Sequence, residues 1–167
     1  LPVKAVSKTL STIKIADNID ITLGALKDMF LIKRPHLVVS ALNPHASDNG
    51  LLGTEEQEII YPALKRARKN NPGSIIDGPL PADVAVSLGA HSEYDCIIAM
   101  YHDQALIPLK LSDSSTGVNL TLGLGFVRTS PLHGVAFDIA GKFIASPASL
   151  IQSVKLSALC TLNLRKS

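Results

Sequence analysis

Hydrophobic residues recur with helical spacing near both ends of the chain. In residues 15–30 they lie three or four positions apart, which predicts an amphipathic helix that packs on a sheet. Residues 147–164 carry a longer apolar pattern of the same kind. Ser146 stands where an N-cap is expected and Pro147 at the first helical position, so this helix should begin there.

Three other stretches have the patterns of β-strands. Residues 37–42 and 96–100 are continuous apolar runs, which are typical of short strands buried in a parallel sheet. Apolar and polar positions alternate in residues 117–122, and Phe126-Val127 follows, which indicates one or two further β segments.

The middle of the chain combines helix signals with turn signals. Thr54-Glu55-Glu56-Gln57 fits a capping box at the start of a helix, which Pro62 should kink. Residues 70–83 are rich in glycine, proline and asparagine, which predicts an ordered loop between elements. Residues 82–88 indicate a short helix.

The order of these elements predicts an α/β layered fold. The pattern leaves open whether the sheet is wholly parallel. The chain has 167 residues, 46% of them hydrophobic and 18% charged, which is ordinary composition for one globular domain with a sizeable core.

Composition and charge argue against several classes of partner. The formal net charge is +2 and the basic residues are scattered, so we expect no nucleic-acid partner. No apolar run approaches the ~20 residues that span a bilayer, and no signal-peptide pattern opens the chain, so we expect no membrane partner and a cytoplasmic location. Cys96 and Cys160 lie in apolar patterns and should be buried free thiols.

Candidate chemistry is concentrated just after the apolar run 96–100. His102 and Asp103 follow this run, at the edge where open α/β sheets place their ligands. A histidine beside an aspartate suits a metal ligand with a carboxylate neighbour, or a general base. A purely structural pair at a loop edge is the alternative.

His45 occupies the equivalent place after the run 37–42. Neutral imidazoles from two loops at one sheet edge can hold a divalent ion. Sequence spacing leaves open whether His45 and His102 converge, and two solvent-exposed loop histidines are the alternative.

Three further polar residues are candidates for binding a small anion. Lys110, Asn119 and Arg128 could clamp a phosphate or carboxylate, the arginine through a two-pronged hydrogen bond and the lysine as a point charge. A solvated surface is the alternative, and the apolar neighbours of each residue argue against it.

Six short motifs occur in a fixed order along nearly the whole chain. They are Leu42-Asn43-Pro44-His45-Ala46, Gly53-Thr54-Glu55-Glu56, Gly78-Pro79-Leu80-Pro81-Ala82-Asp83, Tyr101-His102-Asp103-Gln104, Val118-Asn119 and Arg128-Thr129-Ser130. Together they resemble the 4-hydroxythreonine-4-phosphate dehydrogenase family of pyridoxal phosphate biosynthesis. His133-Gly134 and the following Phe137-Asp138-Ile139-Ala140-Gly141-Lys142 also resemble the nucleotide-binding loop of the isocitrate and isopropylmalate dehydrogenase superfamily, which lacks the G-x-G-x-x-G signature.

This resemblance implies an isocitrate/isopropylmalate dehydrogenase-like α/β fold and a homodimer. It also implies oxidation of a phosphorylated hydroxy amino acid by NAD to a 3-keto acid that then loses carbon dioxide. The family uses a divalent metal such as zinc, magnesium or cobalt, held by three histidines. The third lies in a Thr-His-Leu-Pro stretch, and Leu1-Pro2 would begin just after it, so we expect residues 1–167 to be the C-terminal portion of such an enzyme with its N-terminal half missing.

The resemblance also assigns roles to residues. The metal ligands would be His45 and His102, and the substrate-binding residues Lys110, Asn119 and Arg128. Asp103 and Asp83 would be catalytic, and NAD would be bound by His133, Gly134 and Asp138.

Some positions depart from the family pattern. Ala105 and Ser47 replace usual glycines, and Gly125 replaces a usual proline, but none of these changes removes an expected metal or phosphate ligand. Two alternatives therefore remain beside the enzyme interpretation. The chain would be an inactive truncated remnant of the fold, or a related dehydrogenase of another phosphorylated four-carbon hydroxy acid.

Overall fold

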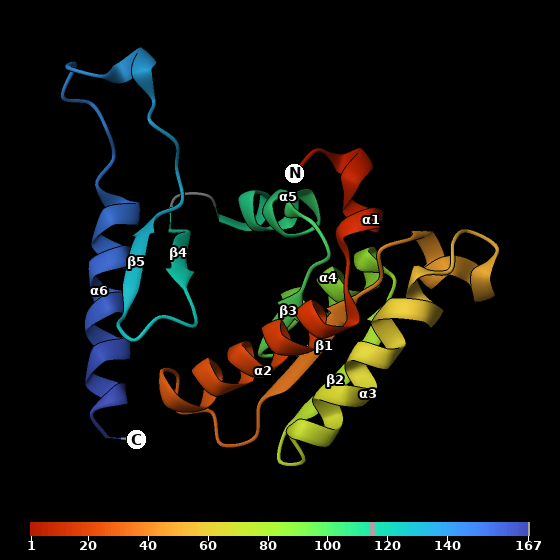
Figure 1. Cartoon of the computed structure of the whole chain (residues 1–167). Helices are drawn as coiled ribbons and strands as arrows, with labels where there is room; N and C mark the ends of the chain where they lie inside the picture. The colour runs from red at the N-terminus through yellow and green to blue at the C-terminus, as the bar shows by residue number, and fades with distance from the viewer. Residues whose placement is uncertain (114–115, 167) are drawn as a thin grey trace.

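A three-stranded parallel sheet lies at the centre of the computed structural model, which describes residues 1–113 and 116–166 (Figure 1). The strands are β1 (His36–Ser40), β2 (Ile75–Leu80) and β3 (Cys96–Ile98), in the order β2-β1-β3. Both neighbours pair with β1 in parallel, which confirms the α/β prediction and answers the question of strand direction for this sheet. Leu37, Val38 and Val39 are fully buried, as the apolar run predicts for a central strand.

Two helices provide most of the core that covers the sheet. α2 (Thr12–Asp28) packs against α3 (Tyr61–Asn70), and Ile19 and Leu23 of α2 share one buried cluster with Leu64 of α3 and Leu37 of β1. The helix predicted at residues 15–30 is thus confirmed. A short 3₁₀ turn (Val3–Ala5) and α1 (Val6–Thr9) precede it, and α4 (Ala82–Ala90) contacts β1 and β3 as the predicted short helix.

The remaining elements form a second packing unit beside the sheet (Figure 1). β4 (Val118–Thr121) and β5 (Arg128–Pro131) are an antiparallel pair, and α6 (Ala148–Leu164) lies along them. Cys160 of α6 packs with Ala25 and Met29 at the end of α2. The Asn163 side chain donates a hydrogen bond of 2.8 Å to the Met29 carbonyl, which joins the two units.

The face that α6 buries differs from the prediction. The pattern of leucines and valines predicts an apolar inner face, yet the buried residues of this helix are Ser149, Ser153, Cys160 and Asn163. Val154 and Leu162 are 62% and 55% exposed. Small and polar side chains meet the hairpin closely, Ser149 through a hydrogen bond to the Gly117 carbonyl. Leu156 packs with the cluster around Cys160, but most of the apolar stripe of α6 faces outward.

Residues 70–83 do not form the predicted loop, because β2 lies within them. Gly78 and Pro79 suggest a turn, but β2 is at the edge of the sheet, where a proline without an N–H donor is tolerated. The register between β1 and β2 shifts between Val38 and Ser40, close to these two residues.

The helix predicted from Thr54 does begin there, since the Glu58 amide donates to the Thr54 carbonyl, and the last helix begins within one residue of its prediction, but the capping of both differs from the prediction. Gln57 does not close a capping box with Thr54, because its side chain bonds to Ser47 instead. A π-helical turn (Glu56–Ile60) precedes α3, so the break associated with Pro62 is a change of helix type just before it. α6 begins at Ala148, with Pro147 at its N-cap position, although the Ser146 hydroxyl accepts a 3.4 Å bond from the Ala148 amide.

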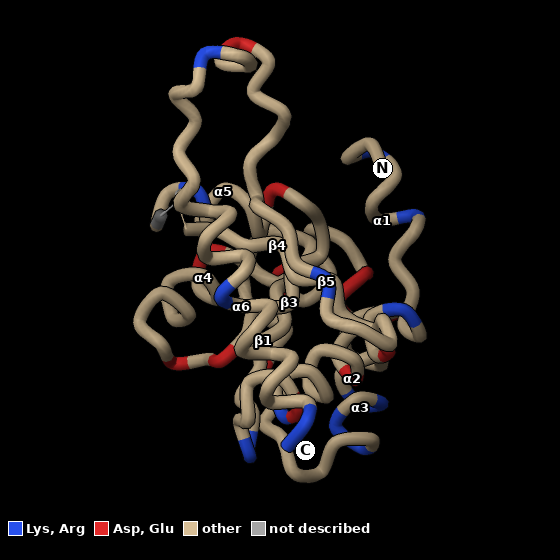
Figure 2. The backbone as a smooth tube through the Cα atoms, turned by 90° about the vertical axis from the view of Figure 1, so that its left-hand side faces the viewer, with Lys and Arg blue, Asp and Glu red and all other residues tan. Residues whose placement is uncertain are grey.

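Charged residues are scattered as expected, whereas the cysteines match the prediction at Cys160 but not fully at Cys96. Figure 2 shows lysines, arginines, aspartates and glutamates spread over many elements. Both cysteines are free thiols; Cys160 is buried but Cys96 only partly, and burial raises the pKa of both. Among the described residues, no helix has the length and apolar character to cross a membrane.

Candidate functional site

The loops that carry the two candidate histidines leave neighbouring strands. His45 follows β1 and His102 follows β3, and the two strands pair in parallel up to Val39 and Ile98. The carboxyl ends of adjacent parallel strands meet at one sheet edge. Both histidine loops therefore begin side by side at one edge of the sheet.

One side chain connects these loops directly. The Gln104 carbonyl oxygen accepts a 2.8 Å hydrogen bond from the Met100 amide, beyond β3. The Gln104 amide nitrogen donates a 2.8 Å bond to the Ala41 carbonyl, beyond β1.

The His45 loop has an unusual backbone supported by a buried acid. His45 to Asn49 all have positive φ, between 46° and 69°, within the turn Pro44–Gly50. Side chains disfavour this left-handed region, so surrounding contacts must hold the loop. Glu56, which is fully buried, accepts bonds of 2.9 and 2.8 Å from the amides of Leu42 and Asn43, directly before the loop.

Further hydrogen bonds connect the same loop to the following helix. The Asn43 side chain donates to Glu55 at 2.8 Å and to Glu56 at 2.9 Å. The bond to Asn43 is the main reason that the pKa of Glu55 lies below its ordinary value. Buried Ser47 exchanges hydrogen bonds with Gln57, so the loop is fixed at its start and in its middle.

His102 begins α5 (His102–Asp113), a helix that the apolar pattern does not predict. Its Nδ1 lies 2.7 Å from Asp103 Oδ1, and the two side chains are 76% and 58% exposed. A ring that donates from Nδ1 to a carboxylate keeps the Nε2 lone pair for a cation. The predicted pairing of His102 with Asp103 therefore has the geometry of a metal ligand and its orienting acid.

The donor chemistry of these loops fits a divalent cation, but the ligand set in this chain is partial. Two imidazole nitrogens suit zinc or cobalt, and a neighbouring carboxylate suits magnesium. Within residues 1–113 and 116–166, no three histidine, cysteine, aspartate or glutamate side chains are grouped to hold a metal. His45 and His102 could supply at most part of a coordination sphere.

The predicted substrate-binding residues are solvent-exposed and come from three elements. Lys110 is in the last turn of α5, Asn119 is on β4 and Arg128 opens β5. Arg128 donates a 2.8 Å hydrogen bond to the Thr121 hydroxyl across the hairpin. Their apolar neighbours therefore do not keep these side chains from the surface, and Leu109 and Leu111 beside Lys110 are themselves 37% and 82% exposed.

The predicted cofactor residues lie on a long excursion between β5 and α6, which projects from the body of the molecule in both views (Figures 1 and 2). His133 and Gly134 line a cavity of about 490 Å³ on this excursion, and Asp138 is in a 3₁₀ turn (Phe137–Ile139) beside it. Asp83 is elsewhere, exposed in the first turn of α4.

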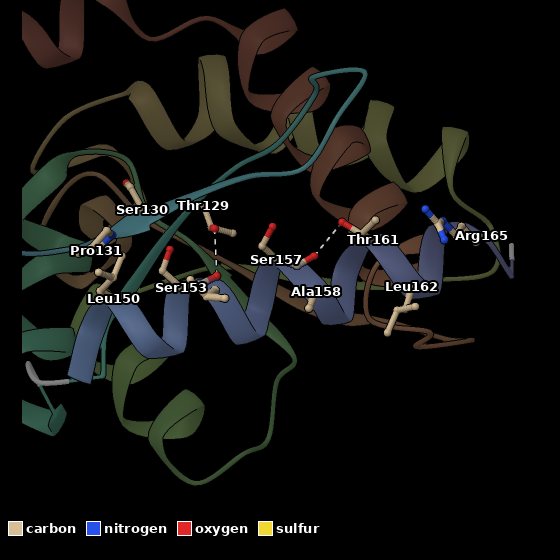
Figure 3. Close-up of a pocket in the computed structure, with 11 residues that line it drawn as sticks. Thr129, Ser130, Pro131, Leu150, Ser153, Ser157, Ala158, Thr161, Leu162 and Arg165 are labelled. Atoms are coloured by element: carbon tan, nitrogen blue, oxygen red, sulfur yellow. Dashed lines mark hydrogen bonds between the residues drawn. The ribbon is translucent and has the colours of Figure 1, made fainter. Parts of the chain in front are cut away.

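A larger hollow of about 660 Å³ lies between β5 and α6 (Figure 3). Thr129 donates a 3.0 Å hydrogen bond to the Ser153 carbonyl beside the hollow, and Leu150 and Leu162 of α6 are among the residues that line it. None of the predicted site residues lines this hollow. It belongs to the outward apolar face of α6.

Sequence reasoning missed the two residues that organise the histidine loops, Glu56 and Gln104. Both stand inside recognised motifs, and an acidic residue directly before an apolar helix face was a usable signal for Glu56. Gln104 has no comparable signal, because its partner Ala41 lies 63 residues away.

Comparison with known proteins places these features in a family. The model of the family described as pyridoxal phosphate biosynthetic protein PdxA matches residues 1–157. The 4-hydroxythreonine-4-phosphate dehydrogenase of Bradyrhizobium diazoefficiens is 54% identical over 144 residues, covering 86% of this chain and 41% of the relative. The enzyme of the same name from Roseobacter denitrificans is 49% identical over 153 residues, covering 92% and 46%.

A solved structure agrees with this result. The crystal structure of 4-hydroxythreonine-4-phosphate dehydrogenase from Klebsiella pneumoniae superposes with a TM-score of 0.83 at 36% identity. The match covers 96% of this chain and 48% of that one. The chain thus spans about half the length of the relatives that it matches.

Proposed function

Because this chain belongs to the family of pyridoxal phosphate biosynthetic protein PdxA, we propose that it forms the C-terminal portion of a metal- and NAD-dependent dehydrogenase. The proposed reaction is oxidation of 4-hydroxythreonine 4-phosphate, followed by loss of carbon dioxide. The observation that carries the proposal is the placement of the His45 and His102 loops on adjacent parallel strands, joined through Gln104.

In this proposal His45 and His102 hold a divalent zinc, magnesium or cobalt ion together with further ligands that the described residues of this chain do not supply. When bound, such an ion polarises the substrate hydroxyl and the ketone that replaces it. Asp103 accepts a hydrogen bond from His102 Nδ1, which orients the ring and would leave the Nε2 lone pair for the ion.

The other candidate residues bind and position the small molecules. Lys110, Asn119 and Arg128 bind the phosphate and carboxylate of the substrate, for which exposed cationic and amide groups are suited. Asp83 is the candidate acceptor for the proton of the hydroxyl group. NAD binds to the excursion that carries His133, Gly134 and Asp138, where His133 and Gly134 line the cavity of about 490 Å³.

A homodimer is part of the proposal, since the exposed candidate residues leave the site open on this chain. A second subunit and the remaining length found in the relatives would close it.

The experiment measures both metal and turnover, on this chain and on the longest natural polypeptide that contains it. His102→Ala should lose bound divalent metal and NADH formation from 4-hydroxythreonine 4-phosphate. His91→Ala is the matched control, because His91 is an exposed histidine at the end of α4 whose ring bonds only to the Ser87 carbonyl among the described contacts. Metal at the unsubstituted level in His102→Ala would disprove the assignment.

A further inference from the structure

We propose that Gln104 is a positioning residue that fixes the spacing of the His45 and His102 loops, and thereby sets the affinity of the site for its metal ion. This inference rests on the proposed function, because it concerns the same two histidines. It assigns Gln104 no contact with metal or substrate.

The Gln104 side chain joins backbone groups just beyond the point where β1 and β3 stop pairing with each other. The pairing of β1 with β3 is last recorded at Val39 and Ile98. Ala41 and Met100, which Gln104 joins, each lie two residues beyond that pair. A side-chain amide carries the same donor and acceptor as a peptide group, so it can extend the connection where the strands separate.

Both hydrogen bonds require an amide at this position. Ala41 is fully buried, and a buried carbonyl without a donor is unfavourable. A carboxylate of nearly the same shape would still accept from Met100 but would offer no donor to Ala41. The substitution Gln104→Glu therefore removes the hydrogen bond to Ala41, which connects the two loops, and keeps the bond from Met100, which lies within one loop.

The two ends of this connection lie close to the histidines in the chain. His102 is in the same first turn of α5 as Gln104, and His45 follows Ala41 on the loop that Glu56 also supports. Metal–nitrogen bonds of about 2.0–2.1 Å tolerate little displacement of either ring. A small separation of the loops would weaken binding without unfolding the protein.

The test compares Gln104→Glu with Asn163→Asp. Asn163 makes a bond of the same kind, from a side-chain amide to the Met29 carbonyl at 2.8 Å, but it joins α6 to the end of α2. The probe is Zn²⁺ alone, titrated calorimetrically into the longest natural polypeptide that contains the chain. Circular dichroism checks the fold, and Gln104→Met serves as a second variant if Gln104→Glu does not fold.

We expect Gln104→Glu to weaken zinc binding about tenfold or more, as substitutions around metal ligands commonly do, and Asn163→Asp to change it less than about twofold. Equal affinity in Gln104→Glu and the unsubstituted protein would overturn the inference. An equal loss in Asn163→Asp would also overturn it, because the effect would then be general destabilisation. Zinc binding that His45→Ala and His102→Ala leave unchanged would instead refute the proposed metal site.

Discussion

At the scale of single residues, Arg128 offers a direct test of substrate recognition. Its exposed guanidinium is held at one nitrogen by Thr121, which leaves the rest of the fork for an anion. We expect Arg128→Ala to raise the KM for the phosphorylated substrate roughly tenfold to a hundredfold, since a charge-assisted hydrogen bond is worth about 1.5–3 kcal/mol. The KM for NAD should change little, as steady-state kinetics can show.

Arg66→Ala is the control for this measurement, because Arg66 is an exposed arginine on α3. Thr121→Val separates the orientation of Arg128 from its charge and should have a smaller effect. If Arg128→Ala raised both KM values equally, Arg128 would organise the hairpin or the cofactor region instead.

The residues of the candidate site were predictable to different degrees. The pairing of His102 with Asp103 is local, so adjacency in the sequence was enough to indicate it. The support of Asn43 by Glu56 and the bond from Gln104 to Ala41 depend on chain segments that meet only after folding. Neither hydrogen-bond partner follows from a periodic pattern.

At the scale of elements, strands and helices with strong periodicity were predicted well. β1 and α2 bury most of the residues that their patterns indicated, but Phe30 lies beyond the end of α2 and is 38% exposed. β2 was missed because glycine and proline usually interrupt strands, and only its edge position permits them. α5 was missed because its mixture of polar residues, apolar residues and Pro108 gives no clear amphipathic face.

Substitution of Gly78 tests how closely β2 packs against β1. It has a φ of 108°, and an added Cβ would collide with the backbone carbonyl of Val39 on β1. We expect Gly78→Ala to lower the free energy of unfolding by about 2–3 kcal/mol, from backbone strain and displacement of β1. Urea denaturation measures this change.

Gly73→Ala is the matched control, since an added Cβ there meets nothing within 4 Å. It should leave the unfolding midpoint nearly unchanged. A neutral Gly78→Ala would mean that β2 adjusts freely against β1, and that the edge of the sheet is not rigid at this point.

At the scale of the whole molecule, α6 separates what a pattern can predict from what it cannot. Its periodicity identified a helix, but a helix with apolar residues on one side can turn that side toward any neighbour. Here the small side chains of α6 pack on the hairpin, and Leu150, Val154 and Leu162 remain outside. A chain that spans about half the length of its relatives has fewer elements available to cover such a face.

This exposed face predicts self-association of the 167-residue chain when it is produced by itself. A contiguous apolar surface on one helix is unfavourable in water and promotes contact between copies. We expect sedimentation velocity to show a weight-average mass that rises with protein concentration. The double substitution Val154→Glu and Leu162→Glu places charge on the hollow shown in Figure 3 and should shift the distribution toward monomer. Ile13→Glu, at an exposed position on α2, should not. A chain that stays monomeric at every concentration, or an Ile13→Glu variant that dissociates it equally, would show that the α6 face does not drive association.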